Sequence, residues 1–312
     1  MKKLNGVISA QQFDRETLEA VFLIADEMKK NPDPELLKGK IMGSLFYEPS
    51  TRTRWSFEIA MLKLGGLCIS TESAGIFSSA AKGESLEDTI RVLSGYPIDL
   101  LTLRYNKKGG AERAEKFSRV PVINAGDGNG QHPTQALLDL YTIRQKYPKI
   151  SGLKIAMMGD LANGRTVRSL CYFLAKHFPD NEIYFISPEA VKMQDDIKEY
   201  LDKHGAKWQE LFEITPEIIA KMNVIYQTRI QKERFQENIS LFEEVSKASE
   251  MFMIGEDFVE QMDKDGIILH PLPRINEIAY AVDKDPRACY FQQAWNGVYV
   301  RMALLKMILI GY

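Results

Sequence analysis

Hydrophobic positions recur along the chain at two spacings, and the change between them predicts an alternation of strands and helices. Apolar residues from Phe13 to Met28 recur every three or four positions, which predicts an amphipathic helix. Short continuous apolar runs predict buried strands instead. These predicted strands are residues 41–46, 67–70, 100–103, 120–124, 154–158, 182–186, 224–226 and 267–269.

Helical spacing fills several of the intervals between these strands. The further predicted helices are residues 55–64, 86–93, 136–147, 166–177, 191–204 and 298–310. Such an order of strands and helices is typical of parallel sheets with helices on both faces. Residues 148–152 form a junction after which the alternation starts afresh. The pattern therefore predicts an α/β protein with two doubly wound parallel-sheet domains.

Composition narrows the class of protein. A chain of 312 residues with 45% hydrophobic and 26% charged residues can bury one large or two moderate cores, and its length favours two domains. The formal net charge of -2 argues against a nucleic-acid or membrane-surface partner. Met1-Lys2-Lys3 is basic, but no apolar segment of signal-peptide length follows it, so we expect a cytoplasmic protein.

Cysteine spacing indicates neither a disulfide framework nor a metal site. The three cysteines are far apart in sequence and lack the spacing of metal ligands; they are Cys68, Cys171 and Cys289. We therefore predict buried free thiols and expect no metal or other cofactor.

A dense group of hydroxyls and arginines lies between the strand 41–46 and the next helix. Ser50, Thr51 and Thr53 alternate there with Arg52 and Arg54. The start of a helix offers unpaired N–H groups at the positive end of its dipole, and arginine forks match phosphate oxygens. A Ser or Thr at this position is often only a helix cap. Three hydroxyls interleaved with two arginines favour an anion-binding cradle.

Other polar side chains follow strands or open helices. Arg104 comes directly after the strand 100–103, and Arg229 and Gln231 come after the strand 224–226. His132 and Gln135 lie at the start of the helix 136–147. Ligands gather at the carboxyl ends of strands in open α/β sheets, so these residues are candidates for a site. Surface arginines and a capping histidine are the alternative interpretation.

Two loops add weaker signals. The predicted loop 71–85 is rich in small residues, and its single lysine, Lys82, can reach outward. Residues 159–164 do not fit the G-x-G-x-x-G dinucleotide pattern, and the turn ends in Arg165. In the segment 270–274, two prolines restrict the backbone.

The stretch Phe46 to Glu58 resembles the carbamoyl-phosphate signature shared by aspartate and ornithine carbamoyltransferases. The resemblance implies that carbamoyl phosphate is bound by Ser50, Thr51, Arg52, Thr53, Arg104, His132 and Gln135. It implies catalytic roles for Arg52, Thr53, Lys82, Arg104 and His132. It also implies an amino-acid site made by Ser78, Lys82, Arg165, Arg229, Gln231, Pro271 and Leu272, with a cis bond before Pro273.

The second substrate follows from charge. Aspartate brings two carboxylates and needs two cationic forks, whereas ornithine needs an acidic group for its distal ammonium. The matching motifs offer Arg165 and Arg229 and no carboxylate, and they lack the two cysteines of ornithine enzymes. The chain is thus similar to the aspartate members, which make N-carbamoyl-aspartate for pyrimidine synthesis.

The family pattern also implies an organisation. Residues 1–132 with 291–312 would bind carbamoyl phosphate, and residues 133–290, including a linking helix 133–147, would bind aspartate. The active site would lie in the cleft between the domains. Lys82 would reach the site of a neighbouring subunit in a homotrimer, and regulatory chains are possible partners.

Transfer without a covalent enzyme intermediate is the expected mechanism. The aspartate amine attacks the carbamoyl carbon, Thr53, Arg104 and His132 stabilise the oxyanion, and the departing phosphate takes the proton. Three alternatives stay open: transfer to another amino acid such as ornithine, an inactive family member that acts as a binding scaffold, and a nicotinamide-dependent dehydrogenase.

Overall fold

The chain folds into two compact units. The computed structural model describes residues 2–77, 79–231, 246 and 250–312. Unit 1 comprises Met1–Tyr141 and Ala294–Tyr312, and unit 2 comprises Thr142–Gln293. The chain therefore passes from unit 1 to unit 2 inside helix α6 (Pro133–Lys146), whereas the sequence placed the whole helix in the second domain. One contact that ties Tyr141 to unit 1 is its hydroxyl, which donates to Asp26 at 2.7 Å.

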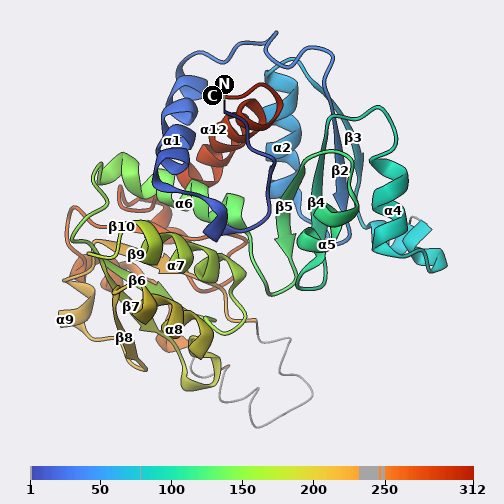
Figure 1. Cartoon of the computed structure of the whole chain (residues 1–312). Coiled ribbons are helices and arrows are strands. Elements are labelled where there is room, and N and C mark those ends of the chain that lie inside the picture. Colours follow the sequence, from blue (N-terminus) through green and yellow to red (C-terminus); the bar gives the residue numbers. More distant parts are fainter. Residues whose placement is uncertain (1, 78, 232–245, 247–249) are drawn as a thin grey trace. The chain divides into compact units, whose positions relative to one another are not determined.

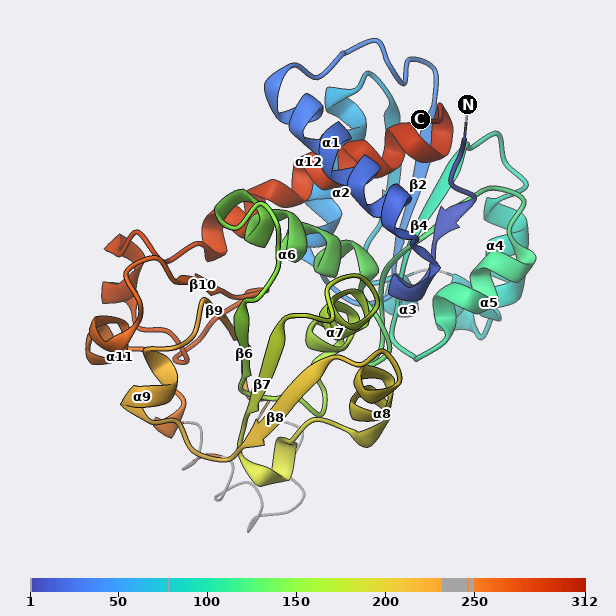
Figure 2. The same ribbon diagram turned by 60° about the vertical axis from the view of Figure 1, so that its left-hand side comes forward.

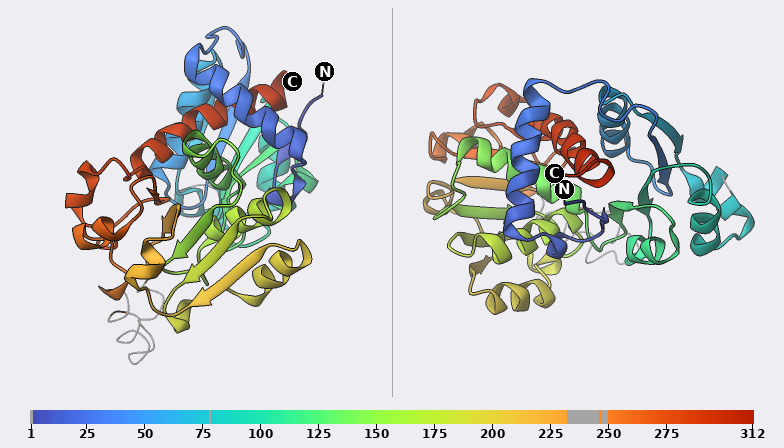
Figure 3. Two further views of the ribbon diagram at one scale, coloured as in Figure 1. Left: turned by 90° about the vertical axis from the view of Figure 1, so that its left-hand side faces the viewer. Right: turned by 45° about the horizontal axis from the view of Figure 1, so that its top comes forward.

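Unit 1 is built on a five-stranded parallel sheet with the order β1-β5-β4-β2-β3. The strands are β1 (Gly6–Val7), β2 (Ile41–Phe46), β3 (Leu67–Thr71), β4 (Leu100–Tyr105) and β5 (Val122–Asp127). Helices α1 (Arg15–Lys30), α2 (Thr51–Lys63) and α12 (Tyr290–Leu309) cover one face, and α4 (Leu86–Leu93) and α5 (Gly110–Phe117) cover the other (Figures 1 and 3). This is the doubly wound arrangement expected from the pattern.

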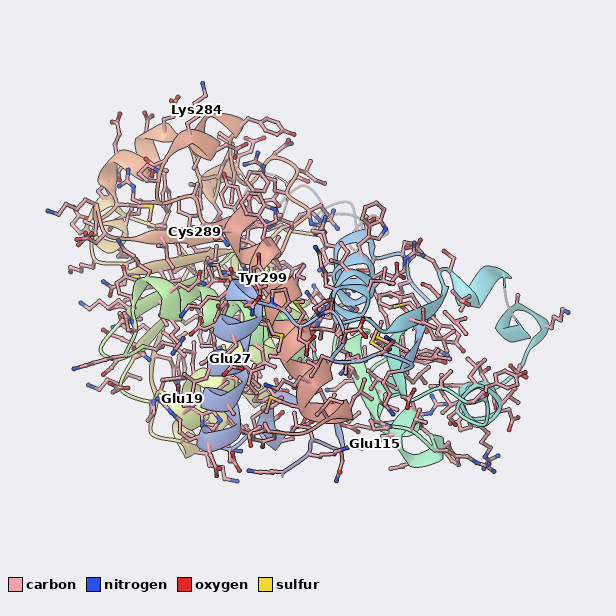
Figure 4. All side chains as sticks on the ribbon, turned by 90° about the horizontal axis from the view of Figure 1, so that it is seen from above. Glu19, Glu27, Glu115, Lys284, Cys289 and Tyr299 are labelled. Carbon is pink, nitrogen blue, oxygen red and sulfur yellow. The ribbon has the colours of Figure 1, made fainter. Side chains whose placement is uncertain are left out.

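The C-terminal helix α12 packs on unit 1, as the family pattern implied. Lys306 pairs with Glu27 on α1 at 3.3 Å, and the Lys29 ammonium lies 5.9 Å from the ring centre of Tyr299. Figure 4 labels Glu27 on α1 and Tyr299 on the neighbouring helix α12. The guanidinium of Arg301 stacks on the Phe57 ring of α2 at 4.8 Å. Residues near the two ends of the sequence thus share one core.

Unit 2 carries a second five-stranded parallel sheet, with the order β10-β9-β6-β7-β8. The strands are β6 (Lys154–Met158), β7 (Glu182–Ile186), β8 (Lys207–Leu211), β9 (Val224–Gln227) and β10 (Ile267–Leu269). Helices α7 (Arg165–His177) and α8 (Asp195–Lys203) lie on one face, and α9 (Pro216–Ile219) and α11 (Glu256–Gln261) lie on the other (Figure 2). Side chains such as Met158, Ile225 and Phe258 form the core.

Every strand expected from the hydrophobic pattern is present, but weakly patterned elements were missed. Strand β8 is an edge strand with mostly polar residues, and α5 mixes small and charged residues, so neither shows a clear apolar period. The expected loop 71–85 contains two short helical turns, Ala74–Phe77 and Ser79–Lys82. Helix α12 starts at Tyr290, well before the expected residue 298.

The cysteines are free thiols, as expected, but only Cys171 is fully buried. Cys68 and Cys289 are half-buried. Burial raises the pKa of the Cys68 and Cys171 thiols to about 12. These two thiols are therefore poor nucleophiles at neutral pH. Across the described residues, no helix has the length and apolar character needed to span a membrane.

The turn after α2 gives a stability prediction. Gly65 has φ +84°, and a Cβ placed there would lie 2.0 Å from the Pro34 carbonyl oxygen. Gly39 has a similar φ of +78° but open space around its Cβ position. Gly39→Ala should cost about 1–2 kcal/mol of unfolding free energy, the price of left-handed backbone alone. Gly65→Ala should cost at least about 3 kcal/mol because the backbone must also move.

Urea denaturation of both variants and the wild type provides the measurement. Equal shifts of the unfolding midpoint for the two variants would show that the close approach at Gly65 is without consequence.

Candidate functional site

The predicted residues of unit 1 meet at one edge of its sheet. Strands β5, β4 and β2 are consecutive neighbours and run parallel, so their carboxyl ends lie side by side. The hydroxyl-arginine cradle follows β2, Arg104 belongs to the end of β4, and His132 follows β5. Three segments that are distant in sequence therefore contribute to one region, which we call the unit 1 site (Ser50, Thr51, Arg52, Thr53, Arg104, His132 and Gln135).

The cradle has the geometry of an anion site. Ser50 is the N-cap of α2, yet its side chain makes no capping hydrogen bond, so simple capping does not account for its hydroxyl. Thr51 and Arg52 are exposed at the first turn, whereas Thr53 is buried. The surrounding protein lowers the pKa of Arg52 by desolvation, but an arginine stays charged at neutral pH. The helix start therefore offers N–H groups, hydroxyls and one full positive charge.

His132 links the starts of two helices. Its Nε2 lies 3.4 Å from the Thr53 hydroxyl of α2, and its Nδ1 lies 3.5 Å from the Thr134 hydroxyl of α6. The side chain is only 4% exposed. Thr53 at the start of α2 and His132 before α6 therefore lie next to each other, near the positive ends of two helix dipoles.

Carboxylates hold the arginines in place. Arg104 Nε lies 3.4 Å from a Glu48 carboxylate oxygen. Arg54 pairs with Glu58 at 3.4 Å and with Glu72 at 2.8 Å. Glu72 also accepts a hydrogen bond from the Ser50 backbone N–H at 3.2 Å. Sequence reasoning counted Arg54 among the cradle charges, whereas the structure gives it a bracing role.

Gln135 is oriented by a residue that the sequence did not single out. Its Nε2 donates to the buried carboxylate of Asp139, one helical turn later, at 2.8 Å. The side-chain carbonyl oxygen is then the amide atom left to accept a hydrogen bond from a ligand. The spacing of four residues in the helix was the signal that could have revealed the pair.

The predicted residues of unit 2 also gather at one sheet edge. Strands β10, β9 and β6 are consecutive and parallel. Arg165 opens α7 after β6, and the segments after β9 and β10 supply the rest of what we call the unit 2 site (Arg165, Arg229, Gln231, Pro271 and Leu272). All five residues are partly exposed at this edge.

Asp160 organises this edge from within. It is fully buried, and its carboxylate accepts hydrogen bonds from the Asn163 backbone and side chain at 3.0 Å and from the Gln231 N–H at 3.4 Å. A carboxylate two residues beyond a strand was its only sequence signal. Because the acid is engaged inside the protein, it does not offer a ready partner for a ligand ammonium.

The loop after β10 has an unusual backbone. The peptide bond between Leu272 and Pro273 is cis, as the resemblance implied. Leu272 has φ +56°, which is rare for a residue with a branched side chain. Such conformations persist only where surrounding contacts impose them.

Lys82, from the small-residue loop, is not joined to these sites. Lys82 is exposed at the end of a short helical turn, and within the described part of unit 1 no hydrogen bond or ion pair links it to the cradle. Ser78 lies outside the described residues. In the described ranges, no group of three or more His, Cys, Asp or Glu side chains could hold a metal ion.

Family comparison covers both units. Residues 5–145 match the profile "Aspartate/ornithine carbamoyltransferase, carbamoyl-P binding domain", and residues 151–308 match "Aspartate/ornithine carbamoyltransferase, Asp/Orn binding domain". The chain belongs to the aspartate/ornithine carbamoyltransferase family. Within this family, the unit 1 site lies in the carbamoyl-phosphate part and the unit 2 site in the amino-acid part.

Relatives in this family are similar over almost the whole chain. The chloroplastic aspartate carbamoyltransferase 2 of Pisum sativum is 53% identical over 99% of this chain and 80% of its own length. The aspartate carbamoyltransferase catalytic subunit of Clostridium novyi is 45% identical over 97% of each chain. The Trypanosoma cruzi aspartate transcarbamoylase in complex with carbamoyl phosphate superimposes with a TM-score of 0.91 at 38% identity, covering 97% of this chain and 95% of that one.

The cradle gives a binding prediction. Arg52→Ala should weaken binding of inorganic phosphate by roughly 10- to 100-fold, because one charge-assisted hydrogen-bonding group is lost. Isothermal titration with phosphate provides the measurement. Arg113→Ala, which removes a surface arginine paired with Glu87 at 2.6 Å, is the control. Equal phosphate affinity in wild type and Arg52→Ala would rule out the cradle.

Proposed function

We propose that the protein transfers the carbamoyl group of carbamoyl phosphate to the amine of L-aspartate, giving N-carbamoyl-L-aspartate and phosphate. The observation that carries the proposal is the pair Arg165 and Arg229 at one sheet edge, in a chain whose other sheet edge holds an anion cradle. Two cationic forks match the two carboxylates of aspartate. The relatives named aspartate carbamoyltransferase support the same substrate.

The proposed reaction uses substrate groups for bond making. The aspartate amine attacks the carbamoyl carbon, the bond to the phosphate oxygen breaks, and the departing phosphate takes the amine proton. Thr53, Arg104 and His132 donate hydrogen bonds to the oxyanion of the tetrahedral intermediate. The hydroxyls and N–H groups of the cradle, with Arg52, hold the phosphate. Holding both reactants in contact accounts for much of the expected acceleration.

In this proposal, the hydrogen-bond donors of the substrates face acceptors of the protein. Its amino group donates hydrogen bonds, and Gln135 presents a carbonyl oxygen because Asp139 engages the amide nitrogen. For the aspartate amine, the backbone carbonyls of Pro271 and Leu272 are the proposed acceptors. Arg165, Arg229 and Gln231 then bind the aspartate carboxylates.

Incubation with carbamoyl phosphate and either aspartate or ornithine tests the reaction. We expect N-carbamoyl-aspartate and one phosphate per turnover, identified by mass spectrometry and a phosphate assay, and no citrulline. Arg52→Ala serves as the inactive control. Citrulline formation would show that ornithine is the acceptor. Absence of any ureido product would favour a binding scaffold.

A homotrimer is the second part of the proposal. Large apolar side chains of α2 and the edge strand β3 are exposed on unit 1, with Trp55 57% and Ile69 63% exposed. The patch comprises Trp55, Ile59, Leu62, Leu67 and Ile69. Apolar patches and open strand edges of this kind are typical of protein interfaces. We propose that neighbouring subunits cover this patch and that Lys82, with Ser78, completes the site of the next subunit.

Subunit mixing tests the shared site. Lys82→Ala and Arg229→Ala chains should each be nearly inactive, because each removes a positive group that binds substrate. A mixed trimer contains some sites in which both groups are intact, so part of the activity should return. Steady-state rates of trimers with verified mixed composition provide the measurement, and unmixed trimers of each variant are the controls. No recovery in the mixtures would contradict the shared site.

The biological setting stays a prediction. The product suits de novo pyrimidine synthesis, and the sequence predicts a cytoplasmic location, whereas several plant relatives are named chloroplastic. Relatives named catalytic subunits make regulatory chains possible partners.

A further inference from the structure

His270 is a buried titratable residue that the proposed reaction does not use. It directly follows β10 and is only 2% exposed. Its backbone N–H donates to the Gln293 side-chain oxygen of α12 at 2.8 Å. Both of its ring nitrogens also have partners in the loop that follows. The side chain therefore connects the strand end to that loop at two points.

The two ring nitrogens make different contacts. The Leu272 backbone N–H donates to Nδ1 at 2.7 Å, so Nδ1 carries no proton. Nε2 lies 2.9 Å from a Glu277 carboxylate oxygen, so Nε2 carries the proton and donates. The contacts thus select one neutral tautomer of His270.

Glu277 supports the same loop from its other side. Its second carboxylate oxygen accepts the Ile275 and Asn276 N–H groups at 3.1 Å each. Burial acts to raise the pKa of Glu277, but the hydrogen bonds from His270 and the backbone lower it on balance. The carboxylate is therefore ionised at neutral pH and holds the imidazole in place.

His270 contacts Leu272, whose backbone conformation is rare. Leu272 has φ +56°, a conformation that costs a residue with a side chain roughly 1–2 kcal/mol. The hydrogen bond from its N–H to Nδ1 is a contact that favours this conformation over an extended one. The direction of the neighbouring carbonyl groups depends on it.

We infer that His270 is a positioning residue, which in its neutral Nε2–H tautomer fixes the Leu272 backbone so that the loop carbonyls face the substrate amine. The inference rests on the proposed function, since that function assigns the amine to Pro271 and Leu272. His270 itself does not touch the substrate in this account. It acts through one hydrogen bond to the main chain.

Protonation of His270 would break its hydrogen bond with the Leu272 N–H. A proton on Nδ1 would place a donor against the Leu272 N–H, and the hydrogen bond would be lost as the pH falls. The charged group that faces the ring directly is the Glu277 carboxylate. Arg274 of the loop pairs with Asp283 of the following 3-10 helix (Tyr280–Lys284), and the Gln293 amide that contacts His270 from α12 is neutral.

Two substitutions separate the two contacts. In His270→Asn the amide oxygen can occupy the position of Nδ1 and keep the bond to Leu272, while the contact to Glu277 is lost. In His270→Gln the longer side chain reaches the position of Nε2 and loses the bond to Leu272. We expect His270→Gln to lower kcat/KM for aspartate by roughly 10- to 100-fold through loop misplacement, and His270→Asn to keep most of it. The reverse order would overturn the inference.

A pH profile distinguishes positioning from space filling. The ratio of kcat/KM for aspartate in wild type to that in His270→Asn should fall below the pH at which His270 protonates, since Asn has no proton to gain. A flat ratio across that pH would contradict the inference. Thermal unfolding midpoints of both variants check that neither is simply unfolded.

Nuclear magnetic resonance provides a readout that needs no activity. Long-range proton–nitrogen spectra of the wild type should show His270 with Nδ1 unprotonated and Nε2 protonated at neutral pH. A protonated Nδ1 would overturn the inference even if aspartate is carbamoylated. Conversely, the expected tautomer in a protein that fails to carbamoylate aspartate would refute only the proposed function.

Discussion

Parallel hydrogen bonding between neighbouring strands is the constraint on which both sites depend. In unit 1 it brings the carboxyl ends of β2, β4 and β5 to one edge, and in unit 2 it does the same for β6, β9 and β10. Each strand end then delivers a short segment with one or two polar side chains. A shift of one residue in the register would turn these side chains to the other face of the sheet. The ladders therefore set the chemistry as well as the fold.

Clustered positive groups repel one another, and the structure offsets this with carboxylates placed behind them. Glu48 pairs with Arg104, and Glu72 pairs with Arg54 while accepting the Ser50 N–H. In unit 2, the Asp160 carboxylate instead holds two neutral groups, accepting hydrogen bonds from Asn163 and from the Gln231 N–H. A positive group held by such contacts loses little freedom when a ligand binds. The carboxylates thus preorganise the cationic groups without neutralising the exposed Arg52.

Much of the fold followed from the hydrophobic pattern because strands buried on both faces of a parallel sheet have strong apolar runs. The strands around Leu45, Met157 and Ile225 were all found in this way. Strand β8 was missed because an edge strand tolerates polar residues such as Gln209, and the first unit boundary was displaced because only tertiary contacts of Tyr141 determine it. The candidate site residues were predicted from strand ends and the family motif. Their supports, among them Asp139, Asp160 and Glu277, were not, since a single carboxylate has no distinctive local signal.

The sequence by itself determined the classes of elements, and it predicted an anion-binding cradle at Ser50 to Thr53 and a preference for a doubly acidic acceptor. Composition, spacing and residue type suffice for these because they depend on local chemistry. Only the tertiary structure decided which strands are neighbours, that Arg54 braces while Arg52 stays exposed, and that His270 holds the Leu272 backbone. These outcomes depend on contacts between segments that are separate in sequence, or on a backbone conformation, such as the positive φ of Leu272, that the residue type does not predict.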